Sequence, residues 1–215
     1  MYDMESTRVY KNEGDPKMAM TSVPKRRRNA AATREAILQS ALVAFSRAGY
    51  DGAGLREIAQ EAGVTAILVN RYFGSKDGLF AAVVETTFAD HRLWAGDIAT
   101  LGKRIAHHLV VKTGKETRSV DPFRLILRSA PNTRAAAILR KSIEKHFERP
   151  LANSLLGDEI GTRAALFLSV IAGFRLMRTI IGTRGLAEAN ETALSGRLAA
   201  LLQLLIDDVK NGERE

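Results

Sequence analysis

Apolar residues recur every three to four positions along most of this 215-residue chain, which is the period of an amphipathic α-helix. Ile37, Ala41 and Phe45, for example, share one face of a segment that ends at Gly49. The pattern predicts no strand, because no segment shows a convincing alternation of apolar and polar residues. Helices are expected at residues 33–49, 55–62, 66–73, 75–94, 97–111, 121–130, 132–149, 160–182 and 188–210. The sequence therefore predicts an all-α protein of about nine helices.

Residues that commonly begin or end helices stand at many of these boundaries. Thr33, Thr65 and Ser75 each precede a helical segment, and their hydroxyl groups are expected to accept a hydrogen bond from a backbone N–H of the first turn. Proline lacks a backbone N–H and is therefore expected near helix ends. Three prolines fall at or near the ends of later helices: Pro122, Pro131 and Pro150.

The chain divides into three parts by pattern and charge. Residues 1–28 have almost no apolar period and hold seven basic and four acidic residues, so they are predicted to be a disordered basic tail. Residues 29–78, with five residues of each sign, are expected to form a three-helix head, and residues 79–215 a larger helical body. The net charge of +8 suggests a polyanionic partner, which is nucleic acid, an acidic membrane surface or an acidic protein.

One short segment of the head suggests which partner. In "AGVTAILVNRYFGSK" (residues 62–76) two short helices meet at a glycine turn, which is typical of a helix-turn-helix whose second helix lies in the DNA major groove. At 100° per residue, Val69 and Phe73 face the other helices, whereas Ile67 and Arg71 point furthest from them. Leu68 and Asn70 lie on the flanks.

The outward residues have chemistry that suits DNA. An aliphatic side chain can contact thymine methyl groups, Arg71 can bind guanine and Asn70 adenine. Thr65, Tyr72 and Lys76 lie at helix starts or edges, where phosphate is usually bound. The alternative is a plain scaffold helix, in which the aliphatic residues pack against another part of the protein and Arg71 is only solvated.

The longer segment "LREIAQEAGVTAILVNRYFGSKDGLF" resembles the DNA-binding head of the TetR family of bacterial regulators. The resemblance covers about residues 33–80. It rests on a small residue followed by Gly63-Val64 in the turn, on Thr65, on Tyr72-Phe73 at the helix end, and on the pattern F-x-S-K-x-x-L from Phe73 to Leu79. It implies a helix-turn-helix DNA-binding domain at residues 29–78 and a ligand-binding and dimerisation domain at residues 79–215.

The resemblance also implies roles for individual residues. Arg56, Ala66, Ile67, Leu68 and Arg71 match base-reading positions, and Tyr72 and Lys76 match phosphate-contacting positions. The chain departs from the family pattern at Gly54, where a capping Thr is usual, and at Asn70, where a phosphate-binding Tyr is usual. The role of Asn70, on phosphate or on adenine, therefore stays open.

A basic run immediately precedes the head. It is expected to enter an adjacent minor groove or to lie along phosphates, or else to be a solvated part of the tail. Its members are Lys25, Arg26, Arg27 and Arg28.

The last two predicted helices carry more apolar residues than one helix face can hold. Residues 160–182 are apolar nearly all round, and the final helix has a stripe of apolar residues. The two helices either close the core of one chain or meet their copies about a two-fold axis. The family resemblance implies homodimerisation through these helices. The stripe consists of Leu194, Leu198, Leu201, Leu202, Leu205 and Val209.

The middle helices are expected, from the resemblance, to surround a pocket for a small-molecule effector. Aromatic and Met side chains at helical spacing belong more often to an ordinary core than to a pocket. Arginine pairs one turn apart, Arg124 with Arg128 or Arg175 with Arg178, can bind a ligand carboxylate or form salt bridges with nearby acids. The candidate pocket residues are His91, Trp94, Phe123, Leu127, Arg128, Phe174 and Met177.

Several other classes of protein do not fit the sequence. It contains no cysteine, so it has no disulfide, zinc-finger or thiol-nucleophile pattern, which fits the cytoplasm. His107 and His108 are adjacent and diverge on a helix, and no metal-ligand spacing, nucleophile elbow, P-loop or dinucleotide fingerprint is found. No enzyme activity, cofactor or metal is therefore expected. No signal peptide is visible, and Arg175 and Arg178 interrupt the longest apolar helix, so no membrane span is expected.

The expected function is sequence-specific transcriptional regulation. We expect a homodimeric repressor that binds a palindromic operator in double-stranded DNA and is released by an unknown small-molecule effector. The alternative is a ligand-independent architectural or protein-interaction factor that binds DNA mainly through its basic tail. The effector, the operator, the regulated genes and the sign of regulation do not follow from the sequence.

Overall fold

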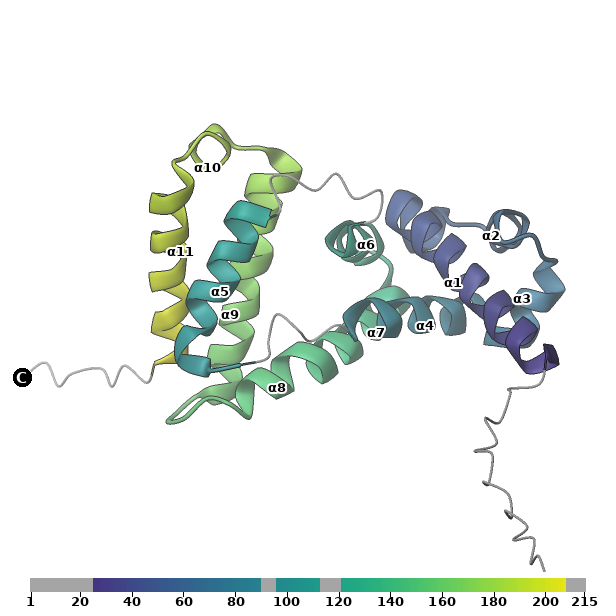
Figure 1. Ribbon diagram of the computed structural model, residues 1–215, viewed down its shortest axis with the longest axis horizontal. Helices are drawn as coiled ribbons and strands as arrows, with labels where there is room; N and C mark the ends of the chain where they lie inside the picture. Colours follow the sequence, from purple (N-terminus) through teal and green to yellow (C-terminus); the bar gives the residue numbers. More distant parts are fainter. Residues whose placement is uncertain (1–24, 90–95, 113–120, 208–215) are drawn as a thin grey trace, which may run out of the picture.

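The computed structural model describes residues 25–89, 96–112 and 121–207, and every element among them is helical. This confirms the predicted all-α class. The head consists of α1 (Lys25–Gly52), α2 (Leu55–Glu61) and α3 (Ala66–Phe73), and α4 (Lys76–Phe88) follows it. The head lies at one end of the molecule, α5, α9, α10 and α11 lie at the other, and α4, α6 and α7 lie between them (Figure 1).

The remaining elements form the body. Several are continuous with a neighbour and differ from it only in hydrogen-bonding pattern, η1 being a 3₁₀ turn and η2, η3 and η4 being π-helical. They are η1 (Ile98–Thr100), α5 (Leu101–His107), η2 (His108–Lys112), α6 (Pro122–Ser129), α7 (Thr133–Ile143), η3 (Glu144–Glu148), α8 (Arg149–Ala152), α9 (Ile160–Arg175), η4 (Leu176–Ile181), α10 (Arg184–Ala187) and α11 (Glu191–Ile206).

Two of the three predicted N-caps are present. The Thr65 hydroxyl accepts a hydrogen bond from the Leu68 N–H at 3.3 Å, and the Ser75 hydroxyl accepts one from the Gly78 N–H at 3.1 Å. The prediction for Thr33 is wrong. Its hydroxyl lies inside α1 and donates to the Asn29 carbonyl at 2.8 Å, because the helix begins before it, at Lys25. Three consecutive alanines, the strongest helix formers, precede Thr33 and allow this extension.

The helix boundary expected at Gly49 is present, whereas the one expected at Pro150 is not. Gly49 interrupts the regular conformation of α1, with φ +70° and ψ −178°, where the sequence places the helix end. Pro150 instead lies within a continuous helical run that extends from α7 through η3 to α8. In a regular α-helix its ring would clash with the carbonyl of the fourth preceding residue. The wider π-helical turn of η3, directly before Pro150, relieves this clash.

The buried apolar residues form two separate clusters. The first contains residues of α1, α2, α3 and α4 together with Leu125 of α6 and Ala135 and Leu139 of α7. The second joins α5, η2, α8, α9 and α11. The expected division at residue 78 therefore runs through the first cluster, in which α4, α6 and α7 pack directly on the head.

Two groups of polar contacts fix the helices that pack on the head. At the end of α1, Arg128 of α6 donates a hydrogen bond to the Arg47 carbonyl, and the Asn132 amide donates to the Asp51 carboxylate at 2.8 Å. The α6 backbone comes so close to Gly49 that a Cβ there would lie 2.3 Å from the Arg128 carbonyl oxygen. Only glycine can occupy this position without moving α6.

The second group joins α4 to the run of α7 and η3. One carboxylate oxygen of Glu85 is 2.7 Å from the Lys145 Nζ and 2.9 Å from the Nε2 of buried His146, and Ser142 donates to the other at 3.3 Å. The hydrogen bond from Lys145, followed by that from His146, lowers the pKa of Glu85 to about 2, although partial burial opposes the shift. Glu85 is thus held as an anion between the two helices.

We expect Gly49→Ala to lower the free energy of unfolding by about 2–5 kcal/mol. The backbone conformation costs a non-glycine residue about 1–3 kcal/mol, and the overlap with a backbone carbonyl adds a cost of about the same size. Gly63→Ala is the control, because Gly63 also has a positive φ, +67°, but no atom lies within 4 Å of its added Cβ. Urea denaturation of both variants measures the difference. Equal losses would show that the contact with α6 does not constrain Gly49.

We expect the stabilising effect of Glu85 to depend on pH. A carboxyl group whose pKa is lower in the folded state stabilises the fold above its unfolded pKa and loses that effect as pH falls through the folded value. The difference in unfolding free energy between the wild type and Glu85→Gln should therefore be full above about pH 4.5 and shrink towards about pH 2. Urea denaturation between pH 6 and pH 3 measures it. In a Lys145→Gln background the difference should be smaller at every pH; an unchanged, pH-independent difference would contradict the assignment.

Candidate nucleic-acid interface

The α2–α3 unit is a compact helix-turn-helix. The chain leaves α2 through Gly63, whose φ of +67° reverses its direction, and the Val64 N–H donates to the Ala59 carbonyl at 2.9 Å. Thr65 then caps α3. Val69 is fully buried, and Val64 and Phe73 pack against the same cluster. A helix of only eight residues is thereby held rigidly on the head.

The opposite face of α3 is open. Ile67 is 81% exposed, Asn70 and Arg71 are exposed, and Leu68 is half-buried. Arg71 has no ion-pair partner in the part of the chain that the structure describes. The alternative in which Ile67 packs against another part of the same chain is therefore wrong. The face presents an aliphatic group, an amide and a guanidinium side by side.

The other head residues predicted to contact DNA differ in accessibility. Arg56 on α2 and Thr65 are exposed, whereas Ala66 and Tyr72 are half-buried and pack against the first cluster. The Tyr72 ring is tilted against that of Phe73, with 6.3 Å between the ring centroids. Only the outer edges of Ala66 and Tyr72 are thus available to a partner.

Lys76 occupies a different environment from the one its pattern suggests. Its ammonium donates to the Asp51 carbonyl at 3.3 Å and lies 4.9 Å from the centroid of the Tyr50 ring. The Tyr50 hydroxyl donates to Asp77, and burial, followed by the nearby Asp77 carboxylate, raises the pKa of Tyr50 to about 12. Lys76 and Tyr50 therefore tie the start of α4 to the end of α1 in this structure.

The last helices expose a second distinct surface. Leu201 and Leu204 of α11 are 55% and 59% exposed, and further exposed apolar side chains lie on α9 and η4. Most of the predicted apolar stripe is not available to a second chain. Leu198 and Leu202 are buried in the chain's own core, and Leu194 and Leu205 pack against that core. Leu201 alone of the stripe is an exposed large apolar residue, and Val209 lies outside the described residues. The exposed residues of α9 and η4 are Leu166, Met177, Ile180 and Ile181.

The same region bears on the expectation about membranes. The continuous helix Ile160–Ile181 is long and apolar enough to cross a bilayer by length and composition, although it contains three arginines, and only 11% of its apolar window is buried. Core helices of soluble proteins satisfy the same criterion. What the helix requires is a partner for its apolar surface.

Comparison with known proteins gives two matches that together cover most of the chain. The family model described as "Bacterial regulatory proteins, tetR family" matches residues 37–83, and the one described as "Tetracyclin repressor-like, C-terminal domain" matches residues 99–206. The chain belongs to the TetR family of transcriptional regulators.

Among curated TetR-type relatives, RutR of Escherichia coli K12 is 41% identical over 66 residues, which is 31% of each chain. BetI of Paraburkholderia phymatum is 36% identical over 73 residues, 34% of this chain and 35% of BetI. The chain thus spans about a third of the length of these relatives.

Solved structures of other TetR regulators extend the likeness to the whole fold. Reduced NemR of Escherichia coli superposes with a TM-score of 0.62 at 16% identity, covering 81% of this chain and 98% of NemR. FadR of Bacillus subtilis, solved with stearoyl-CoA, gives a TM-score of 0.60 at 14% identity over 80% and 99% of the two chains. At these identities the likeness concerns the fold alone.

The residues predicted to line an effector pocket of this TetR protein lie in different environments. His91 and Trp94 lie outside the described residues. Phe123 of α6 is buried, and it meets Arg175 at the end of α9, whose guanidinium carbon is 4.9 Å from its ring centroid. Phe174, Leu127 and Met177 are partly exposed. The placement of Arg128 in the pocket is wrong, because its side chain extends to the Arg47 carbonyl of the head.

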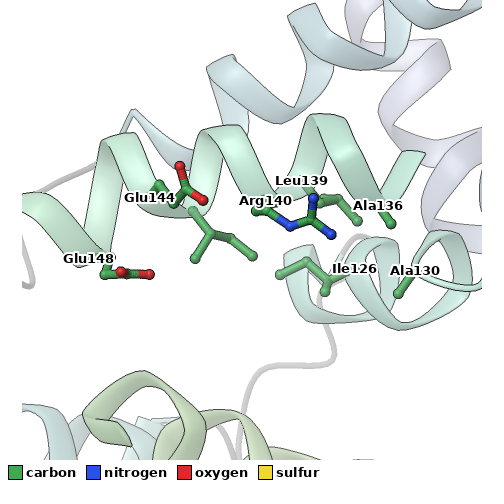
Figure 2. Close-up of a pocket in the computed structure, with 8 residues that line it drawn as sticks. Ile126, Ala130, Ala136, Leu139, Arg140, Glu144 and Glu148 are labelled. Atoms are coloured by element: carbon green, nitrogen blue, oxygen red, sulfur yellow. The ribbon is translucent and has the colours of Figure 1, made fainter. Parts of the chain in front are cut away.

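Two hollows lie elsewhere in the body. One, of about 290 Å³, lies between α6 and the run of α7 and η3, and Figure 2 shows Ile126 and Leu139 facing it, with the carboxylates of Glu144 and Glu148 along one side. The other, of about 680 Å³, lies between α5 and α11. Neither is lined by any of the five predicted pocket residues that the structure describes. Among the described residues no cluster of potential metal ligands is found.

Sequence reasoning missed one basic residue that lies beside α3. The Arg34 guanidinium lies 5.1 Å from the centroid of the Phe73 ring, which brings α1 next to the end of α3. Arg34 is exposed and adds a positive charge beside α3. The signal available in the sequence was weak, because helical periodicity shows which face Arg34 occupies but not which helix that face meets. The four residues Lys25, Arg26, Arg27 and Arg28, expected in a disordered tail, form the first turn of α1.

Proposed function

We propose that this protein is a homodimeric, ligand-responsive repressor that binds a palindromic DNA operator in the cytoplasm. The observation that carries the proposal is the open face of α3. A short helix, capped by Thr65 and fixed by buried Val69, presents Ile67 and Arg71 to solvent without partners in the rest of the described chain. Such a rigid, mixed apolar and basic face is what direct reading of base edges requires.

The proposed DNA contacts divide by chemistry. Ile67 and Leu68 contact thymine methyl groups, Arg71 binds guanine, and Asn70 binds adenine or phosphate. The remaining groups position the head on the sugar-phosphate backbone or reach bases from its edge. They are Arg56, Thr65, Ala66, Tyr72, Lys76 and the basic turn of Lys25, Arg26, Arg27 and Arg28. For Lys76, contact with phosphate requires that its ammonium leave or share the Asp51 carbonyl.

The proposed dimer uses the exposed apolar face of α9, η4 and α11. The low burial of the helix Ile160–Ile181 and the exposure of Leu201 and Leu204 support this proposal. A two-fold axis through such a face brings two α3 helices to successive major grooves, about 34–36 Å apart. The operator would then be a palindrome.

The proposed effector acts through the helices that pack on the head. Regulators of the same fold have been solved with small molecules, FadR with stearoyl-CoA and EbrR with proflavin. In this protein α6 contacts the end of α1 through Arg128 and Gly49, and η3 holds α4 through Glu85. A ligand that favours a different arrangement of these helices changes the spacing of the two heads. Its effect on DNA affinity equals its differential affinity for the two arrangements, typically about 1–3 kcal/mol.

Selection of bound duplexes from random DNA tests the proposal, and a palindrome is the expected result. On the selected operator, Arg71→Ala should lower affinity by about 1–3 kcal/mol and relax the preference at one position of each half-site. Arg149→Ala on α8 removes the same charge from an exposed site outside the head and outside the proposed dimer face, and should have little effect. An equal loss on all sequences for Arg71→Ala would remove Arg71 as a base reader.

The architectural alternative has its own distinguishing outcome. Changing Lys25, Arg26, Arg27 and Arg28 together to Gln should weaken binding to all duplexes and reduce the salt dependence, while the preference for the selected operator remains. If this variant loses all binding and the wild type selects no palindrome, binding through the basic segment is the better explanation.

We expect Leu201→Glu combined with Leu204→Glu to convert the dimer into a monomer, because two buried, unpaired carboxylates are incompatible with an apolar interface. Sedimentation equilibrium measures the association, and operator titration should show a parallel loss of affinity. Ile67→Glu is the control: it places a carboxylate on an exposed apolar position in the head and should abolish operator binding without affecting the dimer. Retention of the dimer by the double variant would refute this interface.

A further inference from the structure

A pair of arginines with unsatisfied buried donors lies where the end of α9 meets the start of α6. Arg175 donates from Nη2 to the Asp121 carboxylate at 2.8 Å, and the two side chains are only 23% and 16% exposed. Arg178, in η4, has its guanidinium carbon 5.9 Å from the centroid of the Phe174 ring. Both cations are therefore flanked by aromatic faces and largely removed from water.

The hydrogen-bonding capacity of this pair is not filled. The Nε of Arg175 and the Nη1 of Arg178 are buried and have no hydrogen-bond partner among the described residues. Arg178 also has no acidic side chain within ion-pair distance in the described part of the chain, whereas Arg175 has Asp121. Arg175 is paired with Asp121 and Arg178 is unpaired among the described residues, which leaves one uncompensated positive charge. A buried, unsatisfied charged donor is unfavourable, so the site favours an added acceptor.

We propose that Arg175 and Arg178 bind the carboxylate of an amphipathic effector whose apolar part lies against neighbouring apolar side chains. A single carboxylate supplies the one negative charge that the cluster lacks, and its two oxygens match the donor geometry of guanidinium groups. Phe123, Phe174 and partly exposed Met177 provide apolar surface beside it. The proposal rests on the proposed function, since it names the chemical class of the ligand of a ligand-responsive regulator.

The position of the site connects it to the head. The Asp121 oxygen that binds Arg175 also accepts the Phe123 N–H at 2.9 Å and thereby caps α6. A ligand carboxylate that binds Arg178 and shares Arg175 with Asp121 weakens the Arg175–Asp121 pair and so alters the cap at the start of α6. The other end of this eight-residue helix, about 12 Å away, carries Arg128, which is bonded to the head. Binding at the arginine pair is thus linked to the contact between α6 and α1.

Calorimetric titration of the full chain with decanoate and with 2-naphthoate tests the proposal, each compared with its uncharged amide. We expect both carboxylates to bind and the amides to bind about 10–100-fold more weakly, as for the loss of a charge-assisted hydrogen bond. Arg178→Gln should weaken carboxylate binding by a similar factor. Arg124→Gln, which removes an exposed arginine from α6, is the control and should leave it unchanged. Decyl phosphate distinguishes a site for carboxylates from one for any anion, and tighter binding of the phosphate would overturn the assignment to carboxylates.

Two further measurements separate the possible outcomes. Thermal unfolding of Arg178→Gln should show no loss of stability, because the change removes an unsatisfied guanidinium donor. Arg178→Lys keeps the positive charge but not the forked donor geometry of the guanidinium, and it should bind carboxylates with intermediate strength. Operator affinity is measured first without any probe, so that failure to select an operator counts against the proposed function alone. If the operator is bound but neither carboxylate binds, or Arg178→Gln binds both as the wild type does, the arginine pair is not an effector site.

Discussion

The contact between α6 and the end of α1 is the constraint on which the rest of the structure depends. At Gly49 the two backbones approach so closely that no side chain fits, and the Arg128 side chain bonds to the Arg47 carbonyl beside it. A contact between backbones cannot adapt by a change of side-chain rotamer. The direction of α1, and with it the orientation of the recognition helix α3, therefore follows from the position of α6.

Because of this contact, the boundary between the two hydrophobic clusters does not coincide with the end of the helix-turn-helix. The head shares its hydrophobic cluster with α4, α6 and α7, and the Glu85 group fastens α4 to η3. The second cluster, in α5, α8, α9 and α11, carries the surface proposed for dimerisation. If the first cluster moves relative to the second, the head, α4, α6 and α7 are expected to move together, because they are packed in the same cluster. The pair of Arg175 and Asp121 lies where α9 of the second cluster meets α6 of the first.

Local features of the fold were predictable because their causes are local. Thr65 and Ser75 cap helices since each hydroxyl lies directly before a helical segment, and Gly63 reverses the chain where only a positive φ can. Thr33 shows the limit of this reasoning: the same residue type lies inside α1, because the helix continues through the preceding alanines. Pro150 shows another, since a π-helical turn allows a helix to continue where a regular one would stop.

By itself the sequence determined the class of fold, the helix-turn-helix and the outward face of α3, because periodicity and capping depend on residues a few positions apart. Tertiary structure alone decided which faces meet. It directed Arg128 to the head instead of a pocket, buried Leu198 and Leu202 within one chain while leaving Leu201 exposed, and placed Asp121 against Arg175. A helical pattern records that a side chain faces away from water or towards it. The partner it meets is fixed only by the packing of residues far apart in the chain.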